Sequence, residues 1–296
     1  MRVHRILTVG ALLIDCVLAP WHRVSAQPRT LTAQQAVDRI TSNLGGRWAG
    51  DGTDSFKDGD PNTPVTGVAV TMMATMDVLQ RAAAGGMNLI ITHEPTFYSH
   101  ADRLTALEQE HDAVTAEKRA FIREHHLVVW RLHDHWHFPL RTPDPVVTGV
   151  FRALDWQRYQ RSPGENPIVL PETTLGALAS DIAKRLGVRT MRVVGDPGLR
   201  VTKVAFLPGF PGFELQRGFL QRDDVEVLVM GEAHEWETIL YAADAGTQGR
   251  RKALIVLGHI PSEQAGSEEL VRWLQPLLPD LPVKLVPAAE PFWSPQ

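Results

Sequence analysis

The chain has 296 residues, 44% of them hydrophobic, and a formal net charge of −4 at pH 7. This length is sufficient for one large buried core or for two smaller ones. No cluster of Lys and Arg interrupts the sequence. This excludes the charge pattern of nucleic-acid-binding proteins and of proteins that bind anionic membrane surfaces.

Residues 1–26 are expected to be a signal peptide that is removed on export. Basic residues at the start precede an apolar stretch too short to span a bilayer, and Val24 and Ala26 occupy the small-residue positions of a cleavage site. We therefore expect a periplasmic or secreted protein with no membrane attachment after cleavage. Cys16, the only cysteine, would be removed too, so any metal site must use His, Asp and Glu. The alternative is a wrongly assigned start codon.

The first half of the mature chain alternates short apolar strands with helices. Apolar periodicity predicts, in chain order, strand 68–70, helix 73–84, strand 89–91, helix 102–126 and strand 127–132. Gly85 and Gly86 stop the first of these helices. A helical crossover of this length between two strands implies that the strands are parallel.

The second half repeats this alternation. It predicts helix 173–188, strand 190–196, a strand and glycine-rich loop over 201–213, strand–loop–helix units over 224–246 and 251–278, and a last strand within 281–288. The fold class is therefore α/β, with two α/β halves and largely parallel sheets. "RSPGENPIVLPE" resembles a linker, so we divide the mature chain into residues 27–155 and 156–296.

Potential metal ligands follow four of the predicted strands. They are His93 and Glu94, the stretch "HDHWH" (133–137), Glu232 and His234, and finally His259 and Glu263. The carboxyl ends of parallel strands meet at one crevice, so these side chains can converge although they are distant in sequence. A single histidine at a strand end is usually only solvated, and for His234 we favour that interpretation. The coincidence of four strand ends favours a metal site.

The local structure around these residues has alternatives. If the strand continues through "HDHWH", then His133, His135 and His137 share one face, whereas a polar loop is equally compatible. Ser262 is expected to cap a helix that begins at Glu263.

Histidine and carboxylate without sulfur suit zinc, iron, manganese or nickel rather than calcium. The candidate metal ligands are His93, Glu94, His133, His137, His259 and Glu263. One tetrahedral ion needs fewer groups, so two divalent ions are expected. Two ions about 3.5–4 Å apart favour hydrolysis, because they activate a water and polarise the substrate.

Two further motifs surround the expected site. "LPGFPGF" (207–213) is more compatible with a tight loop that shapes the cleft than with a phosphate loop, because Pro208 and Pro211 lack donors. Trp136 and Trp236 lie within the candidate metal loops and are expected to form walls of the pocket.

These motifs together resemble the dinuclear-metal hexamer family related to the yeast NGG-one-interacting factor three, often labelled GTP cyclohydrolase I type-two homologues. "THEP" (92–95) is similar to the family's "THHP", "HDHWH" to its "HTxxD", "GHIPSE" (258–263) to its "GHxxxE" and "EPF" (290–292) to its "DPF"; Gly231-Glu232 matches its "GE" loop. The resemblance covers residue 35 to the end.

The resemblance implies two α/β halves packed around a central metal cleft, and a homo-oligomer, by analogy a toroidal hexamer. It implies a two-ion site with ligands His93, Glu94, His137, His259 and Glu263, and with His133 beside them. Glu94 stands where the family usually has histidine, and His137 where it usually has aspartate. We hypothesise that this exchange is reciprocal and that the composition of the ligand set is kept.

The sequence thus predicts a metal-dependent, dinuclear hydrolase that acts on a small molecule of unknown identity. Glu232 or His133 is the candidate catalytic proton carrier, because neither is needed as a ligand. The alternative is a non-catalytic metal-binding scaffold whose ring is the functional unit. An exported location argues against a nucleotide substrate.

Overall fold

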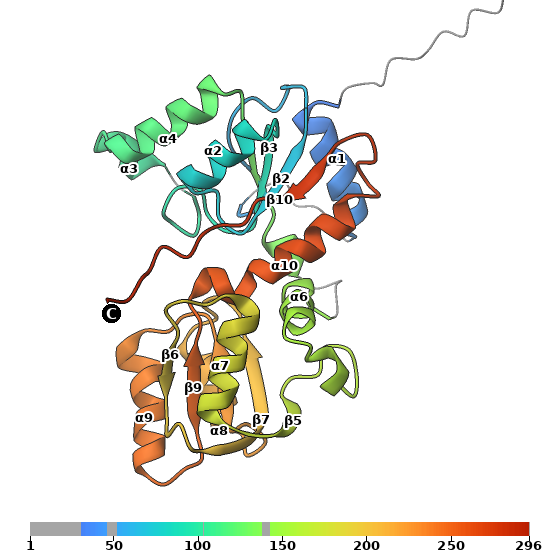
Figure 1. Ribbon diagram of the computed structural model, residues 1–296. Coiled ribbons are helices and arrows are strands. Elements are labelled where there is room, and N and C mark those ends of the chain that lie inside the picture. The colour runs from blue at the N-terminus through green and yellow to red at the C-terminus, as the bar shows by residue number, and fades with distance from the viewer. Residues whose placement is uncertain (1–30, 46–51, 103, 138–142, 296) are drawn as a thin grey trace, which may run out of the picture.

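The computed structural model describes residues 31–45, 52–102, 104–137 and 143–295. The predicted signal peptide lies outside the described residues. Two five-stranded sheets, one in each half, are connected by helices that run between them (Figure 1). Within the described ranges, no helix combines the length and the apolar character needed to cross a membrane.

The first sheet has the order β1-β4-β3-β2-β10. Its strands are β1 (Phe56–Asp58), β2 (Val68–Thr71), β3 (Leu89–Thr92), β4 (Val128–Arg131) and β10 (Val283–Leu285). All neighbours are parallel except β1 and β4. The last strand of the chain therefore returns to the sheet built by the first strands. The predicted division at residue 155 assigns every strand except β10 to the half that contains its sheet.

The second sheet has the order β5-β7-β8-β9-β6. Its strands are β5 (Ile168–Thr174), β6 (Arg192–Val194), β7 (Arg200–Leu207), β8 (Val227–Met230) and β9 (Ala253–Val256). The three central strands are parallel, and the two edge strands β5 and β6 are antiparallel to their neighbours. The prediction of α/β halves with largely parallel sheets is confirmed.

Helices cover both faces of each sheet. They are α1 (Ala33–Leu44), α2 (Met76–Ala84), α3 (Thr105–Gln109), α4 (Ala113–Glu124), α5 (Asp134–His137), α6 (Pro145–Ala153), α7 (Leu175–Leu186), α8 (Phe213–Gln221), α9 (Leu240–Thr247) and α10 (His259–Leu274). A 3₁₀ turn (Gln157–Tyr159) follows α6, and a π-helical turn (Glu235–Ile239) precedes α9.

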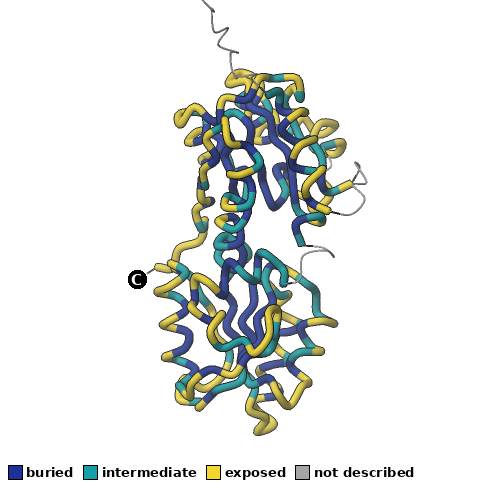
Figure 2. The backbone as a smooth tube through the Cα atoms, turned by 90° about the vertical axis from the view of Figure 1, so that its right-hand side faces the viewer, coloured by how far each residue is buried: buried dark blue, intermediate teal, exposed yellow. Residues whose placement is uncertain are grey.

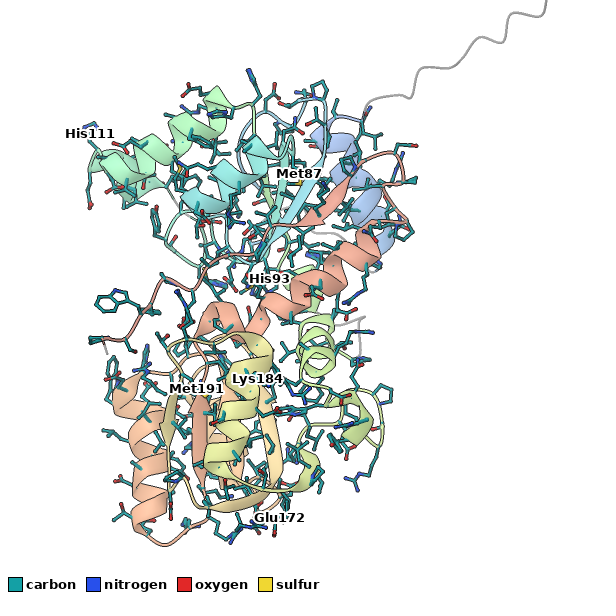
Figure 3. The ribbon with its side chains drawn as sticks, in the orientation of Figure 1. Met87, His93, His111, Glu172, Lys184 and Met191 are labelled. Carbon is teal, nitrogen blue, oxygen red and sulfur yellow. The ribbon has the colours of Figure 1, made fainter. Side chains whose placement is uncertain are left out.

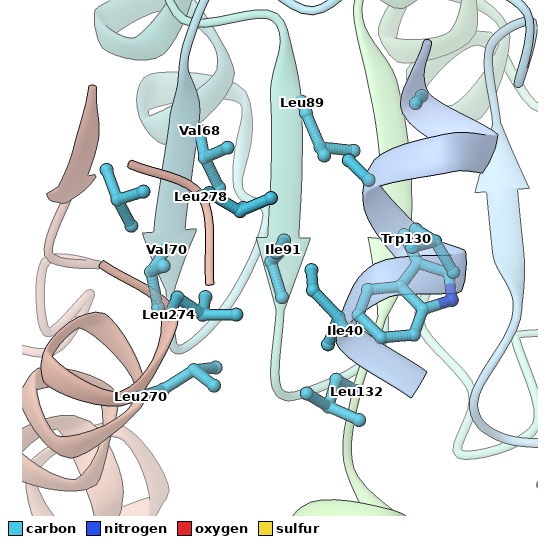
Figure 4. Close-up of a cluster of buried hydrophobic side chains, with 14 of the residues drawn as sticks. Ile40, Val68, Val70, Leu89, Ile91, Trp130, Leu132, Leu270, Leu274 and Leu278 are labelled. Carbon is cyan, nitrogen blue, oxygen red and sulfur yellow. The ribbon is translucent and has the colours of Figure 1, made fainter. Parts of the chain in front are cut away.

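Apolar side chains of the strands and helices form the cores. In the first half, β2, β3 and β4 pack against α1 and α10 on one face, through residues such as Ile40, Ile91 and Leu274 (Figure 4). The strands β2, β3 and β4 of the first sheet and β8 and β9 of the second are buried along their whole length, and β7 is buried along its second half (Figure 2). Fully buried strands of parallel sheets are continuous apolar runs, and this is why the positions of these strands could be predicted from the sequence.

Helix α10 joins the two halves, because Leu270 and Leu274 pack in the core of the first sheet while Ala265 packs against the core of the second. It also packs against α6, whose Val150 and Phe151 belong to that second core. The two helices approach closely at small residues: a Cβ on Gly149 would lie 2.4 Å from the carbonyl oxygen of Ala265, and one on Gly266 would lie 2.6 Å from Cα of Val146. Side chains larger than hydrogen cannot be accommodated at these two positions. The start of α10, which carries two of the predicted ligands, is thereby fixed between the sheets.

Three local predictions were wrong. The helix expected over residues 102–126 is two helices, because Asp112 caps α4 through the backbone N–H of Thr115 and His111 adopts a positive φ of 54°. "HDHWH" forms the helical turn α5 rather than a strand or a loop. Helix α10 begins at His259, with Gly258 as its cap, so Ser262 lies inside the helix.

Candidate metal centre

The predicted ligands converge where the strands of both sheets end. His93 and Glu94 directly follow β3, His133 follows β4, and His137 ends the short helix α5. His259 and Glu263 lie one turn apart at the start of α10, which follows β9 of the other sheet. Figure 3 shows His93 at the junction of the two halves. The site is thus assembled from both sheets.

Helix α5 brings His133, which directly precedes it, and His137, its last residue, onto the same side. The carboxylate of Asp54 accepts hydrogen bonds from the backbone N–H groups of His133, Asp134 and His135, as an N-terminal cap does. The resulting helical turn places His133 and His137 four residues apart on one face. His135 points elsewhere, with Nδ1 2.7 Å from Asp54.

The histidine rings gather closely around His93. Its Nε2 lies 3.0 Å from Nε2 of His137, and its ring stacks on that of His133 at a centroid distance of 4.6 Å. Two ring nitrogens this close suit a shared cation, since ligand atoms of one tetrahedral zinc ion with bonds of about 2.0–2.1 Å lie somewhat over 3 Å apart.

Each of these histidines uses its other ring nitrogen to contact an acceptor. Nδ1 of His93 lies 3.2 Å from the carbonyl oxygen of Leu132. The Nδ1 atoms of His133, His137 and His259 lie 2.7, 2.8 and 3.2 Å from carboxylate oxygens of Asp134, Asp144 and Glu232, respectively. Such partners fix the tautomer and the ring orientation of metal-binding histidines, and leave Nε2 as the ligand atom.

Burial keeps His93 neutral, as a ligand must be. The side chain is 4% exposed. Burial lowers the pKa of His93 well below its ordinary value, and the neighbouring rings of His137 and His133 lower it further. A neutral imidazole has a free lone pair at neutral pH, so binding of a metal ion displaces no proton from it.

The two carboxylates of the centre have different environments. Oε1 of Glu94 lies 3.1 Å from Nε2 of His133 and 3.3 Å from Nε2 of His259, while Oε2 accepts a hydrogen bond of 3.0 Å from Arg131. Although burial opposes ionisation, the hydrogen bonds from the two histidines hold the pKa of Glu94 well below its usual range. Glu94 is therefore a carboxylate at any physiological pH.

Glu263 is buried and incompletely satisfied. Its Oε2 has no hydrogen-bond partner among the described residues, and lies 3.6 Å from Nε2 of both His93 and His259. Burial raises the pKa of Glu263 to about 7. A buried carboxylate oxygen without a donor is costly, and a cation beside it would remove that cost.

The donor set therefore fits a divalent metal ion. Ligand atoms within 4.8 Å of one another form two groups, one of His93, His133 and His137 and the other of His93, Glu94 and Glu263. Nitrogen and carboxylate oxygen are ligands of zinc, iron, manganese and nickel. The two groups share His93, and His259 lies against Glu94 beside them.

A cavity of about 1120 Å³ opens onto this centre and is lined by both halves. Glu94, His133, His137, His259 and Glu263 line it together with Glu232. The two tryptophans do not form its walls, contrary to our expectation. Trp136 is 2% exposed and lies in the core, and the 71% exposed Trp236 stacks on His234 outside the lining.

The loop "LPGFPGF" shapes the cavity, as expected. Gly209 has a φ of +59°, and a Cβ there would lie 2.4 Å from Oε1 of Glu263 and 3.2 Å from Nε2 of His259. Its backbone N–H donates to the hydroxyl of Ser262 at 3.0 Å. Glycine is required because the loop packs directly on two of the candidate ligands.

Sequence reasoning did not identify Arg131 and Asp144. Arg131 is a charged residue within an apolar strand, and that irregularity was its signal. Its fully buried guanidinium donates to Glu94 and to the backbone oxygens of His93 and His100. Asp144 precedes Pro145, which is a typical helix start. One carboxylate oxygen of Asp144 accepts a hydrogen bond from the backbone N–H of Val146, and the other contacts Nδ1 of His137.

All six predicted ligands are thus brought together, with Glu232 at the edge. Glu94 and His137 both face the cluster, as the hypothesis of a reciprocal exchange requires. Glu94 is in addition ion-paired to Arg131. Whether both side chains bind metal stays a prediction.

Comparison with known proteins gives one family match. The model of the family Duf34/NIF3 (NGG1p interacting factor 3) matches residues 48–123 and 167–290. The matched segments contain the motifs around His93 and His259 but not the segment with His133 and His137. A search of curated proteins gave no match.

Solved structures share the fold over nearly their whole length. Staphylococcus aureus protein SA1388 aligns with a TM-score of 0.65 at 16% identity, covering 90% of this chain and 99% of the other. A Bacillus cereus protein related to NIF3 gives 0.63 at 16% identity, with coverage of 90% and 99%. Reduced HcgD from Methanocaldococcus jannaschii gives 0.59 at 14% identity, with coverage of 86% and 98%.

Proposed function

The chain belongs to the Duf34/NIF3 family, and we propose that it is an exported, metal-dependent hydrolase with a dinuclear centre and a small-molecule substrate. One observation carries the proposal. Four histidines from both halves each have Nδ1 against an acceptor and direct Nε2 toward one another and toward two buried carboxylates. Packing alone gives no reason for this arrangement, whereas metal binding requires it.

The residues that would hold the ions are those of the two ligand groups. His93, His133 and His137 would suit one position, and Glu94 with Glu263 would supply carboxylates for a second. Only Nε2 of His93 is free for a metal ion, so His93 would serve one of the two positions. Bound ions supply a Lewis acid that polarises the scissile bond and makes water a better nucleophile. The buried surroundings strengthen these electrostatic effects.

Glu232 is our candidate for moving the proton. It lines the cavity, and its side chain is 50% exposed. The hydrogen bond from His259 lowers the pKa of Glu232, so this carboxylate is ionised at neutral pH and able to accept a proton from an attacking water. His133 is the alternative proton carrier if His93 and His137 hold the first ion without it, because it lines the same cavity.

Two parts of the proposal rest on the sequence. The signal-peptide features of residues 1–26 support export to the periplasm or beyond the cell. The family resemblance supports a homo-oligomer, by analogy a hexamer. Neither part changes the residues assigned to the centre.

The decisive experiment measures metal content and turnover on the same samples. The purified protein is reconstituted separately with zinc, manganese, iron(II) and nickel, and bound metal is quantified by mass spectrometry. His93→Ala is expected to lose metal, while His111→Ala, a change at an exposed loop residue, retains it.

The reconstituted samples are then screened with phosphoesters, amides and cyclic amidines. We expect hydrolysis in one class that is abolished by chelation and by His93→Ala. Metal binding without turnover in any class would refute the hydrolase proposal and favour a metal-binding scaffold. Absence of bound metal in the wild-type protein would refute both.

A further inference from the structure

A buried lysine lies in the wall of the same cavity. Lys118 is on α4, is 5% exposed and lines the cavity. Its Nζ donates one hydrogen bond, of 2.6 Å, to the carbonyl oxygen of Thr96. An ammonium group has three donors, so two are not used by that bond.

This cation lacks a paired anion. Among the described residues, no carboxylate oxygen lies within the 4 Å of an ion pair with Lys118 Nζ. The nearby Asp102 carboxylate is committed to the backbone N–H groups of Thr96 and Phe97, at 3.0 and 2.6 Å. Asp102 still attracts the ammonium at longer range, which partly offsets the effect of burial on the pKa of Lys118. The rings of Phe97 and Tyr98, with centroids 5.6 and 5.3 Å from Nζ, also lie within the range of a cation–π contact.

Burying such a cation without a counter-ion is unfavourable. Burial lowers the pKa of Lys118 to about 8, which is the expected response of an ammonium taken out of water. Buried charges in proteins are normally paired, and an unpaired one beside an open cavity would be stabilised by an anion that enters the cavity.

The rest of the wall has a different character. Met73, Met76, Val147, Phe210 and Leu215 line it with apolar groups from both halves. Such a surface binds an apolar body by removing it from water. The substrate that fits this cavity is therefore amphiphilic.

The charged residues in the wall also limit how many negative charges the bound anion can carry. Lys118 is the only lysine in the described lining, and no arginine occurs there, whereas Glu94, Asp144, Glu232 and Glu263 do. Recognition of a polyphosphate generally uses several cationic or backbone donors. A group with one negative charge matches a single ammonium better.

We propose that Lys118 binds a single anionic group of the substrate, and that the centre acts on amphiphilic monoanions with an apolar body. This inference rests on the proposed function, because it assigns a substrate class to that site. Lys118 is then a binding and specificity-determining residue, and the metal-binding side chains need not contact the anionic group.

The test uses probes of matched chain and similar shape, one anionic and one neutral. Phenylalkyl sulfonates with about two to six methylenes are compared with the neutral methyl sulfones of the same chains, because a sulfonate is a poor metal ligand. Dissociation constants are measured by calorimetry for the full chain, once reconstituted with zinc and once treated with a chelator.

For at least one chain length, the wild type should bind the sulfonate about tenfold more tightly than the sulfone, a difference of about 1.4 kcal/mol, because Lys118 contributes one charge-assisted hydrogen bond. Lys118→Met should abolish this preference. Lys118→Gln, which can still donate to Thr96, guards against misfolding and should abolish it too. Lys184→Met, at an exposed lysine on α7, should keep it.

Other outcomes overturn the proposal. These are equal affinities for both probes at every length, no binding of any probe, or a preference that survives both Lys118 variants. A preference that chelation removes but the variants do not would assign the anion to the metal. A preference retained after chelation supports the role of Lys118 even if the hydrolase proposal fails.

Discussion

The buried pair of Arg131 and Glu94 offers a quantitative prediction, because the arginine holds a candidate metal ligand. The two side chains are 0% and 6% exposed, and their ion pair measures 3.0 Å. Arg131→Met removes this pair and the hydrogen bonds to the backbone oxygens of His93 and His100. Removing one partner of a buried pair costs about 3–5 kcal/mol, since the other charge stays buried without compensation.

The expected loss lies at the lower end of that range, about 3 kcal/mol, because His133 and His259 still contact the other oxygen of Glu94. It is measured as the free energy of unfolding in urea, with a chelator present so that metal binding does not contribute. The double variant Arg131→Met/Glu94→Gln should lose less than the sum of the single changes, because both act on one pair.

Arg123→Met is the matched control. Arg123 lies on α4 with a side chain that is 60% exposed, and its nearest contact with Asp58 is 3.8 Å. An exposed pair of this kind contributes about 1 kcal/mol or less. A loss below about 1 kcal/mol for Arg131→Met, or strict additivity in the double variant, would refute the view that Arg131 holds a charged Glu94.

Three further predictions concern the centre itself. Gly209→Ala should greatly reduce bound metal in elemental analysis, because its Cβ would lie 2.4 Å from Glu263; Gly218→Ala, where a Cβ meets nothing within 4 Å, should bind normally. Asp144→Ala should weaken metal affinity about 10- to 100-fold in competition with a fluorescent chelator, and unchanged affinity would contradict its role. Neighbouring carboxylates outweigh burial and raise the pKa of His259 from 6.5 to about 10 in the folded metal-free protein. The stabilising effect of the protonated His259 is therefore complete below pH 6.5 and is lost as the pH rises to about 10. Urea unfolding at pH 6.5 and 9.5 should therefore show a smaller loss of stability with pH for His259→Gln than for the wild type; equal losses would argue against this assignment.

The sequence predicted those parts of the fold that depend on local patterns. The runs "VAV", "LIIT" and "LVVWR" are apolar because both faces of their strands are covered, and a parallel sheet places their ends together. The proximity of His93 and His133 followed from that rule. His259 follows β9 of the other sheet, so its place beside them depended on the two halves facing one another, which the family resemblance implied. The α/β class and the gathering of the candidate ligands were therefore accessible without a structure.

Features that depend on distant residues were not accessible. The turn α5 forms because Asp54, nearly eighty residues earlier in the chain, accepts hydrogen bonds from its first N–H groups. The return of β10 to the first sheet depends on its pairing with β2, which no local pattern encodes. The helical pattern around Lys118 likewise does not reveal that this residue is buried beside the cavity.

The central claim is that this cluster binds divalent metal. The most direct test is an anomalous difference map from crystals of the zinc- or manganese-reconstituted protein. We predict a peak about 2.0–2.2 Å from Nε2 of both His93 and His137, with a second peak beside Glu94 and Glu263 if the centre is dinuclear. A map without any peak at these side chains, from protein crystallised with excess metal, would contradict the claim.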